Sequence, residues 1–319
     1  MTMKLAFLFP GQGSQSVGMM SGYAHHPEVR ATFAEASDVL GEDLWALVSS
    51  DSDGALDRTV NTQPVMLTAG VAVWRAWLAA GGPRPDIVAG HSLGEYTALV
   101  AAGALAFHDA VPLVRFRAQA MQEAVPAGVG AMAAVMGLDE AGIAAACAEA
   151  AQGEAVEAVN FNAPGQIVIA GHAAAVERAI ATCKARGAKR GVLLPVSAPF
   201  HSSLMKPAAE RLAARLAEVA IAPPEIPVLH NVDVALHRDA AAIRSALARQ
   251  AASPVRWVET VQAMAARGVT RAFECGPGRV LTGLCKRIAP GLEGHALDDG
   301  DAIAAALAAL DVGAKGGSA

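Results

Sequence analysis

A serine between two glycines is the strongest sign of chemistry in this sequence. Gly90-His91-Ser92-Leu93-Gly94 has the G-x-S-x-G spacing of a nucleophile elbow, in which a sharp strand-to-helix turn exposes the serine hydroxyl. The segment 86–89, apolar after Asp86, predicts a short buried strand before the turn, and a helix is expected from Glu95. Backbone N–H groups at a helix start favour developing negative charge, so Ser92 is a candidate nucleophile. The alternative is a serine that merely caps the helix.

A serine nucleophile needs a base within hydrogen-bond reach. His91 is adjacent to Ser92, but neighbouring side chains point apart, so we expect a structural role for it. His201 follows Pro199 in a loop and is the second candidate, although a lone loop histidine is more often a surface residue. No carboxylate stands out as a third member of a triad.

Two further positions could bind the substrate. Gln12 lies in a glycine-flanked loop after the apolar strand 4–9, and ligands gather at the carboxyl ends of strands in α/β sheets. Arg115 and Arg117 are two residues apart in an otherwise mostly apolar helix, so they point to different faces. One can be solvated while the other enters a cleft, where a guanidinium can hold a carboxylate by two parallel hydrogen bonds.

The elements that position these residues alternate between strand and helix. Strands are predicted at 4–9 and 86–89, and helices at 28–40 and 63–80, the latter with Pro64 in its first turn. A helix is also expected over 204–220, followed by short strands near Val228 and Ala272. This alternation predicts a doubly wound α/β sheet.

The middle of the chain has a different pattern. Strands are predicted at 131–136, 155–160, 166–170 and 192–196, with helices at 139–151 and 173–186. The order βαββαβ is typical of a ferredoxin-like domain. The expected organisation is a discontinuous large domain over 1–129 and 197–312, an inserted small domain over 130–196, and a disordered tail over 313–319.

Composition narrows the class of protein. Hydrophobic residues make up 53% of the 319 and charged residues 17%, which permits a large core. No apolar stretch approaches the roughly 20 residues of a membrane span, and no secretory signal is present. The net charge of −5 argues against nucleic acid as the main partner. Four cysteines without paired spacing favour reduced thiols in a cytoplasmic protein, and no metal cluster is indicated.

Several short motifs together carry a resemblance to a known family. They are residues 9–15, 62–64, 90–96, Arg117 with Met121-Gln122, 160–166, His201, Asn231-Val232, Gln250 and 274–278. On these motifs the sequence resembles the malonyl-CoA:acyl carrier protein transacylases over nearly its whole length. The resemblance implies an α/β-hydrolase-like large domain with a parallel sheet and an inserted ferredoxin-like small domain.

The resemblance also implies roles for individual residues. Ser92 would form an acyl-enzyme with His201 as its base, and a backbone carbonyl at Gln250 would orient the histidine. The backbone N–H groups of Gln12 and Leu93 would form the oxyanion hole. Arg117 would bind the malonyl carboxylate. The other substrate-binding residues would be Met121, Asn162 and Phe200, and Phe200 would disfavour methylmalonyl.

The implied partners are malonyl-CoA and an acyl carrier protein, with no prosthetic group or metal and no membrane. The carrier is acidic and coenzyme A carries phosphates, so two basic pairs are candidate contacts with either partner: Lys189-Arg190 and Lys286-Arg287. The alternative is that both pairs belong to an ordinary solvated surface.

Three alternatives stay open at this point. A G-x-S-x-G thioesterase or esterase would use the same serine. A catalytically silent acyltransferase-like subunit would be expected to lack Ser92, His201 or Arg117, and all three are present. A malonyl loader for a polyketide synthase or a malonate decarboxylase would keep the chemistry and change the pathway. The free-standing length favours the fatty acid enzyme, whereas oligomeric state, cognate carrier and acyl selectivity are not predicted.

Overall fold

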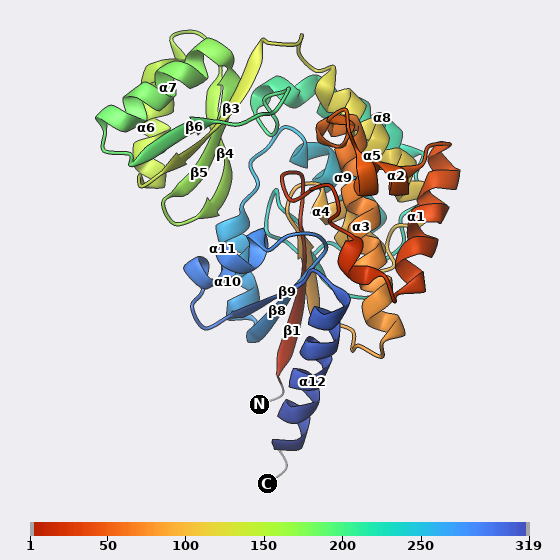
Figure 1. The fold of residues 1–319 in the computed structure, drawn as a ribbon. Coiled ribbons are helices and arrows are strands. Elements are labelled where there is room, and N and C mark those ends of the chain that lie inside the picture. The colour runs from red at the N-terminus through yellow and green to blue at the C-terminus, as the bar shows by residue number, and fades with distance from the viewer. Residues whose placement is uncertain (1–2, 317–319) are drawn as a thin grey trace. The chain divides into compact units, whose positions relative to one another are not determined.

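A computed structural model describes residues 3–316, with side chains up to Leu310. The chain divides into two compact units, and Figure 1 labels helices and strands of both. The first unit contains the residues up to Arg115, Ile221–Leu229 and those from Met264 onward. The second contains Phe116–Ala220 and His230–Ala263.

The first unit is built on a five-stranded parallel sheet. Its order is β7-β2-β1-β8-β9, with bounds β1 Lys4–Phe9, β2 Ile87–Gly90, β7 Val228–Leu229, β8 Val269–Cys275 and β9 Glu293–Leu297. The central strand β1 reads Lys-Leu-Ala-Phe-Leu-Phe, and every residue after Lys4 is buried. A continuous apolar run is what a parallel strand covered on both faces requires. The α/β class predicted for this part is confirmed.

Helices accompany this sheet. Those within the first unit are α1 Pro27–Leu40, α2 Leu44–Ser50, α3 Thr59–Ala79, α4 Gly94–Ala101, α11 Val280–Ile288 and α12 Gly300–Gly316, with short 3₁₀ turns η1 Ser21–Tyr23 and η2 Ala55–Asp57. Helix α3 is apolar on nearly all faces, which is typical of a helix inside a core. Within residues 3–316, none of the helices combines the length and apolarity that a membrane span requires.

The start of α3 differs from the prediction. The helix begins at Thr59 rather than at Gln63, so Pro64 lies in its second turn instead of its first. Polar and β-branched residues hide this start in the sequence, because they favour turns and strands elsewhere. Here they bond locally: the Thr62 hydroxyl donates to the carbonyl oxygens of Leu56 and Arg58, at 2.6 and 3.0 Å.

The second unit contains a four-stranded antiparallel sheet. Its order is β4-β5-β3-β6, with bounds β3 Gly130–Met136, β4 Val156–Ala163, β5 Gln166–His172 and β6 Arg190–Leu193. Helices α6 Glu140–Ala151 and α7 Ala173–Ala185 complete the order βαββαβ, and their apolar faces share one core with the sheet. Figure 1 shows both helices beside this sheet. The ferredoxin-like pattern is confirmed.

The last strand of this sheet lies two residues earlier than predicted, over Arg190–Leu193 rather than 192–196. It is an edge strand that pairs with β3 alone, and Val192 and Leu193 are 39% and 48% exposed. The apolar run was therefore a poor guide to its bounds, because these side chains are not buried.

The remaining helices carry or adjoin candidate site residues: α5 Phe107–Gln122, η3 Ser203–Met205, α8 Lys206–Ala217, α9 Ala240–Gln250 and α10 Trp257–Ala266. The predicted domain limits near 130 and 196 stay a prediction. Helix α12 runs to Gly316, and the last three residues of the predicted tail, 317–319, lie outside the described residues.

Candidate active site

Ser92 lies in a tight turn between β2 and α4. Its φ of +51° is in the left-handed region, which residues other than glycine rarely adopt. The turn is closed by hydrogen bonds from Gly94 N to His91 O and from Glu95 N to Ser92 O, at 2.9 and 3.1 Å. A Cβ on Gly94 would lie 2.0 Å from the carbonyl oxygen of Phe9, so no side chain fits there. This is the strained turn that a nucleophile elbow needs.

The loop after β1 runs beside the elbow. Phe9 and Gly90 are register partners in adjacent parallel strands, and His91 N donates to Phe9 O at 3.0 Å. A Cβ on Gly11 would lie 2.6 Å from His91 O and 3.8 Å from Leu93 N. Gln12 comes three residues after Phe9, and Leu93 comes three residues after Gly90. Within the described part of the chain, neither of their backbone N–H groups donates to another protein group.

Side chains from η2 and from the start of α3 hold the loop that contains Gln12. The Thr59 hydroxyl donates to Gln12 Oε1 at 2.7 Å and accepts from Gln63 Nε2 at 3.3 Å. Gln15 Nε2 donates to Asp57 Oδ1 at 2.8 Å, while its Oε1 accepts from Gly13 N at 2.7 Å. Thr59 carries no motif that marks it in the sequence. Gln63 belongs to one of the motifs that carried the resemblance, which was the available signal.

The second unit brings three candidate residues together. Arg117 Nη2 donates to Gln250 Oε1 at 2.9 Å, and His201 Nδ1 lies 2.9 Å from the Gln250 carbonyl oxygen. All three are buried, at 2%, 3% and 0% exposure for Arg117, His201 and Gln250. Gln250 is the last residue of α9, where carbonyl groups lack intrahelical donors. Gln250 thus contacts both Arg117, the candidate carboxylate-binding residue, and His201, the candidate base.

The hydrogen bond to Gln250 assigns the protons of His201. A carbonyl oxygen only accepts, so Nδ1 carries the hydrogen of the neutral ring. Nε2 is then the basic nitrogen, as a general base requires. His201 has a φ of +66°, and its loop is fixed on either side. Ser202 Oγ donates to Pro199 O at 2.7 Å, and Ser203 N donates to Glu157 Oε2 at 2.9 Å.

The two arginines of α5 have different partners. Arg115 forms a bidentate pair with Glu42, at 2.9 and 2.6 Å, and this hydrogen bond lowers the Glu42 pKa against a smaller effect of burial. Arg117 is 2% exposed, and it donates to the neutral side-chain amide of Gln250. A buried guanidinium is suited to an anionic ligand, because its planar donors match a carboxylate.

The other predicted substrate-binding residues also lie in the second unit. Met121 is one helical turn after Arg117 on α5 and is 1% exposed. Phe200 precedes His201 and is 8% exposed, and Asn162 is half-buried in β4. Their roles stay predictions.

The two basic pairs are exposed. Lys189-Arg190 belongs to the second unit and Lys286-Arg287 to the first. Arg190 is the first residue of β6, and Lys189 directly precedes the strand. Lys286 and Arg287 lie in the last turn of α11, where positive charge also complements the helix dipole. Exposure permits contact with an anionic partner, but the ordinary structural explanation applies equally.

A buried carboxylate supports the first unit. Glu274, at the end of β8, accepts from Leu281 N and Thr282 N at 3.0 and 2.8 Å, so it caps α11. Burial raises the pKa of Glu274 above its usual value, and these hydrogen bonds oppose the shift. Although it belongs to a motif of the resemblance, sequence reasoning gave it no role.

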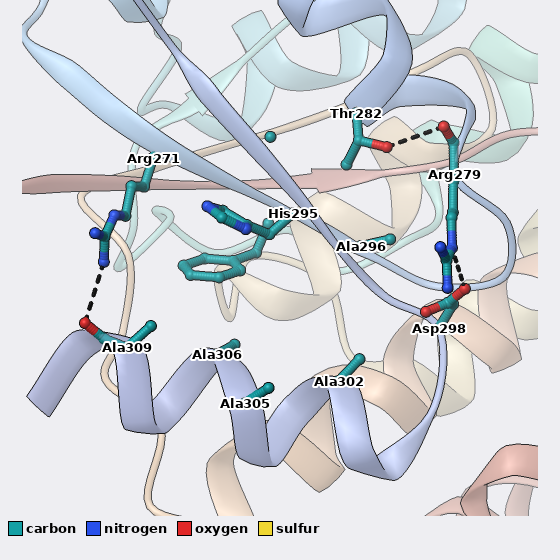
Figure 2. A pocket seen from close by; sticks show the side chains of 12 residues that line it. Arg271, Arg279, Thr282, His295, Ala296, Asp298, Ala302, Ala305, Ala306 and Ala309 are labelled. Atoms are coloured by element: carbon teal, nitrogen blue, oxygen red, sulfur yellow. Dashed lines mark hydrogen bonds and ion pairs between the residues drawn. The ribbon is translucent and has the colours of Figure 1, made fainter.

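The first unit also has a pocket of about 420 Å³ between its sheet edge and α12. Figure 2 shows Arg271 and Arg279 at its two ends, with His295 between them and four alanines of α12 opposite. Arg279 is paired with Asp298 at 2.6 Å and Arg271 with Glu293 at 3.3 Å. None of the candidate site residues lines it. Among residues 3–316, no group of three His, Cys, Asp or Glu side chains is arranged to hold a metal.

Comparisons with known proteins identify the family of this chain. The model of the acyl transferase domain matches residues 6–287. A malonyl CoA-acyl carrier protein transacylase of Salmonella typhimurium is 56% identical over 305 residues, covering 95% of this chain and 99% of that protein.

Two solved structures are similarly close. An acyl-carrier-protein S-malonyltransferase from Burkholderia pseudomallei is 60% identical with a TM-score of 0.94, covering 96% of this chain and 99% of that one. A malonyl-transacylase in complex with a type II PKS acyl-carrier protein is 53% identical with a TM-score of 0.94, covering 95% and 99%. The chain therefore belongs to the acyl transferase family, among the malonyl CoA-acyl carrier protein transacylases.

Proposed function

We propose that this chain transfers malonyl from malonyl-CoA to the phosphopantetheine thiol of an acyl carrier protein, through an acyl-enzyme on Ser92. The observation that carries the proposal is the buried contact of Gln250 with both Arg117 and His201 in a chain of this family. In this arrangement, the Arg117 guanidinium is suited to bind a free carboxylate, and His201 is suited to act as the base.

The first half of the reaction forms the acyl-enzyme. His201 Nε2 takes the proton of the Ser92 hydroxyl as Oγ attacks the thioester carbonyl. The backbone N–H groups of Gln12 and Leu93 stabilise the resulting oxyanion. Collapse breaks the carbon–sulfur bond, and the imidazolium returns the proton to the departing thiolate of coenzyme A. The second half runs in reverse order, with the carrier thiol as the nucleophile.

Arg117 gives the reaction its substrate class. Its planar guanidinium can hold the free malonyl carboxylate by two parallel hydrogen bonds, whereas acetyl and longer acyl groups offer no such group. Met121, Asn162 and Phe200 would contact the acyl group, and the bulk of Phe200 would disfavour a methyl branch. The charged pairs Lys189-Arg190 and Lys286-Arg287 would contact coenzyme A or the carrier.

Transfer rather than hydrolysis requires that water stays away from the acyl-enzyme until the second thiol arrives. The backbone partner of His201 supports this proposal over an acidic hydrolase triad, because Gln250 carries no charge. We further propose that the enzyme works in the cytoplasm, serves fatty acid elongation, and needs no metal or prosthetic group. Serine and histidine suffice for both half-reactions.

The test is intact-protein mass spectrometry after brief mixing with malonyl-CoA and then with a phosphopantetheinylated carrier. We expect a malonyl adduct that maps to Ser92 and moves to the carrier, and Ser92→Ala should abolish it without unfolding the protein. An adduct that decays to free malonate regardless of the carrier would establish a hydrolase. No adduct with any acyl-CoA would favour a silent subunit.

A further inference from the structure

The loop that carries Gln12 has little regular structure of its own. It follows β1 directly, and Gln12 stands between Gly11 and Gly13, of which Gly13 has a φ of +102°. Glycine backbones have a wide range of accessible torsions, so this peptide would otherwise be free to turn. An oxyanion donor must instead point in one direction before the reaction begins.

The side chain of Gln12 is anchored by Thr59, the first residue of α3. The hydroxyl of Thr59 has a single proton, and it is donated to Gln12 Oε1 at 2.7 Å. Its oxygen accepts from Gln63 Nε2 at 3.3 Å, one helical turn later. Thr59 and Gln63 are 3% and 2% exposed, so water competes little for these bonds.

A second link fixes the same loop independently. Gln15 accepts from Gly13 N through Oε1 and donates to Asp57 through Nε2. Asp57 ends the turn η2, and Asp51 accepts from the backbone N–H groups of Ala55 and Leu56 in that turn. Two side-chain bridges therefore tie the loop to the segment 57–59.

We propose that Thr59 is a positioning residue for the oxyanion hole: it orients the Gln12 peptide through the Gln12 side chain. The inference rests on the proposed function, in which the Gln12 N–H stabilises the oxyanion. It adds a residue that contacts neither the substrate nor the reacting atoms.

The test compares three variants with the wild-type enzyme in steady-state malonyl transfer. Thr59→Val keeps the shape and removes the hydroxyl, and Thr59→Ser restores a hydroxyl. The matched control is Thr62→Val, because Thr62 is also a buried threonine of α3 but its hydroxyl bonds only to backbone carbonyls of Leu56 and Arg58.

We expect Thr59→Val to lower kcat by roughly 10- to 100-fold with little change in KM, because misplaced catalytic donors act on the transition state. Thr59→Ser should recover most of the loss. Thr62→Val should lower the melting temperature and leave kcat near that of the wild type. In a double-mutant cycle, Gln12→Ala combined with Thr59→Val should cost little more than either change alone.

Two results would overturn the inference. One is a kcat of Thr59→Val that equals the wild-type value. The other is an equal loss of kcat in Thr59→Val and Thr62→Val that parallels their loss of stability. Failure of the proposed function would look different, because the wild-type protein itself would then give no Ser92 adduct or no transfer to the carrier.

Discussion

Replacing Arg117 by alanine separates binding of the malonyl carboxylate from the rest of the reaction. The guanidinium is 2% exposed, so its pair with a substrate carboxylate would be largely desolvated. Removing one partner of a buried, hydrogen-bonded ion pair costs about 3–5 kcal/mol. At about 1.4 kcal/mol for each factor of ten, kcat/KM for malonyl-CoA should fall by roughly 100- to 5,000-fold.

The same substitution also affects substrates without a carboxylate, for a separate reason. Gln250 loses the donor that lies 2.9 Å from its Oε1, and the Gln250 carbonyl orients His201. Loss of one such hydrogen bond costs about 1.5 kcal/mol, or about tenfold, with either substrate. The preference for malonyl over acetyl should therefore fall by roughly 10- to 500-fold, which is the malonyl loss divided by this shared tenfold loss.

The assay measures kcat/KM for malonyl-CoA and acetyl-CoA with one carrier protein. Arg115→Ala is the matched control, because it removes the same charge from the same helix but loses only the pair with Glu42. That pair is partly exposed, so its loss should cost at most about 1 kcal/mol of stability. Equal losses for both substrates with Arg117→Ala, or a similar change in preference with Arg115→Ala, would refute the carboxylate argument.

Two further predictions concern the first unit: the packing of the turn that holds Ser92, and the buried carboxylate that caps α11. Gly94→Ala places a methyl group 2.0 Å from Phe9 O, so the free energy of unfolding should fall by about 1–3 kcal/mol and activity with it. Gly283→Ala, whose new methyl would have no atom within 4 Å apart from its chain neighbours and the backbone of its own helix, should be tolerated in parallel denaturation curves. Equal stability of the two variants would contradict this account. Glu274→Gln tests the raised pKa of Glu274, the buried carboxylate that caps α11. Above pH 4.5, the ordinary pKa of a glutamate, the folded protein binds the Glu274 proton more tightly than the unfolded chain does. The stability of the wild type therefore contains a contribution that falls as pH rises. The stability of the wild type relative to the variant should therefore shrink with rising pH, and a difference that stays constant or grows would be the opposite of what burial predicts.

The sequence was informative where the relevant residues are close together in the chain. The elbow around Ser92 needs only a strand, a turn and a helix in succession, and all three were predicted within a residue or two. The βαββαβ order was also readable, because each strand and helix there is short and bounded by turns.

Contacts between distant residues could not be read from one sequence. Gln250 lies 49 residues from His201 and 133 from Arg117, and no local pattern indicates either contact. The choice of Arg117 over Arg115 came from family resemblance, since both follow the same helical pattern. Thr59 was missed because a threonine at a helix start has many ordinary roles.

The C-terminal third was the least predictable. Helices α9, α10, α11 and α12 and strand β9 were not anticipated. Alanine is abundant there. It occupies buried, half-buried and exposed positions in α9, and half-buried and exposed positions in the part of α12 up to Leu310, so the apolar periodicity of these helices is weak.

The register between β1 and β2 has a consequence for which changes of length the chain tolerates. Phe9 and Gly90 are aligned, and Gln12 and Leu93 follow them at equal distance along their loops. Deleting or inserting one residue in either strand would move one loop by about 3.3 Å relative to the other and turn its side chains to the opposite face. Length variation among functional homologues should therefore be absent from these two strands and their first three following residues, and be confined to the connections between them.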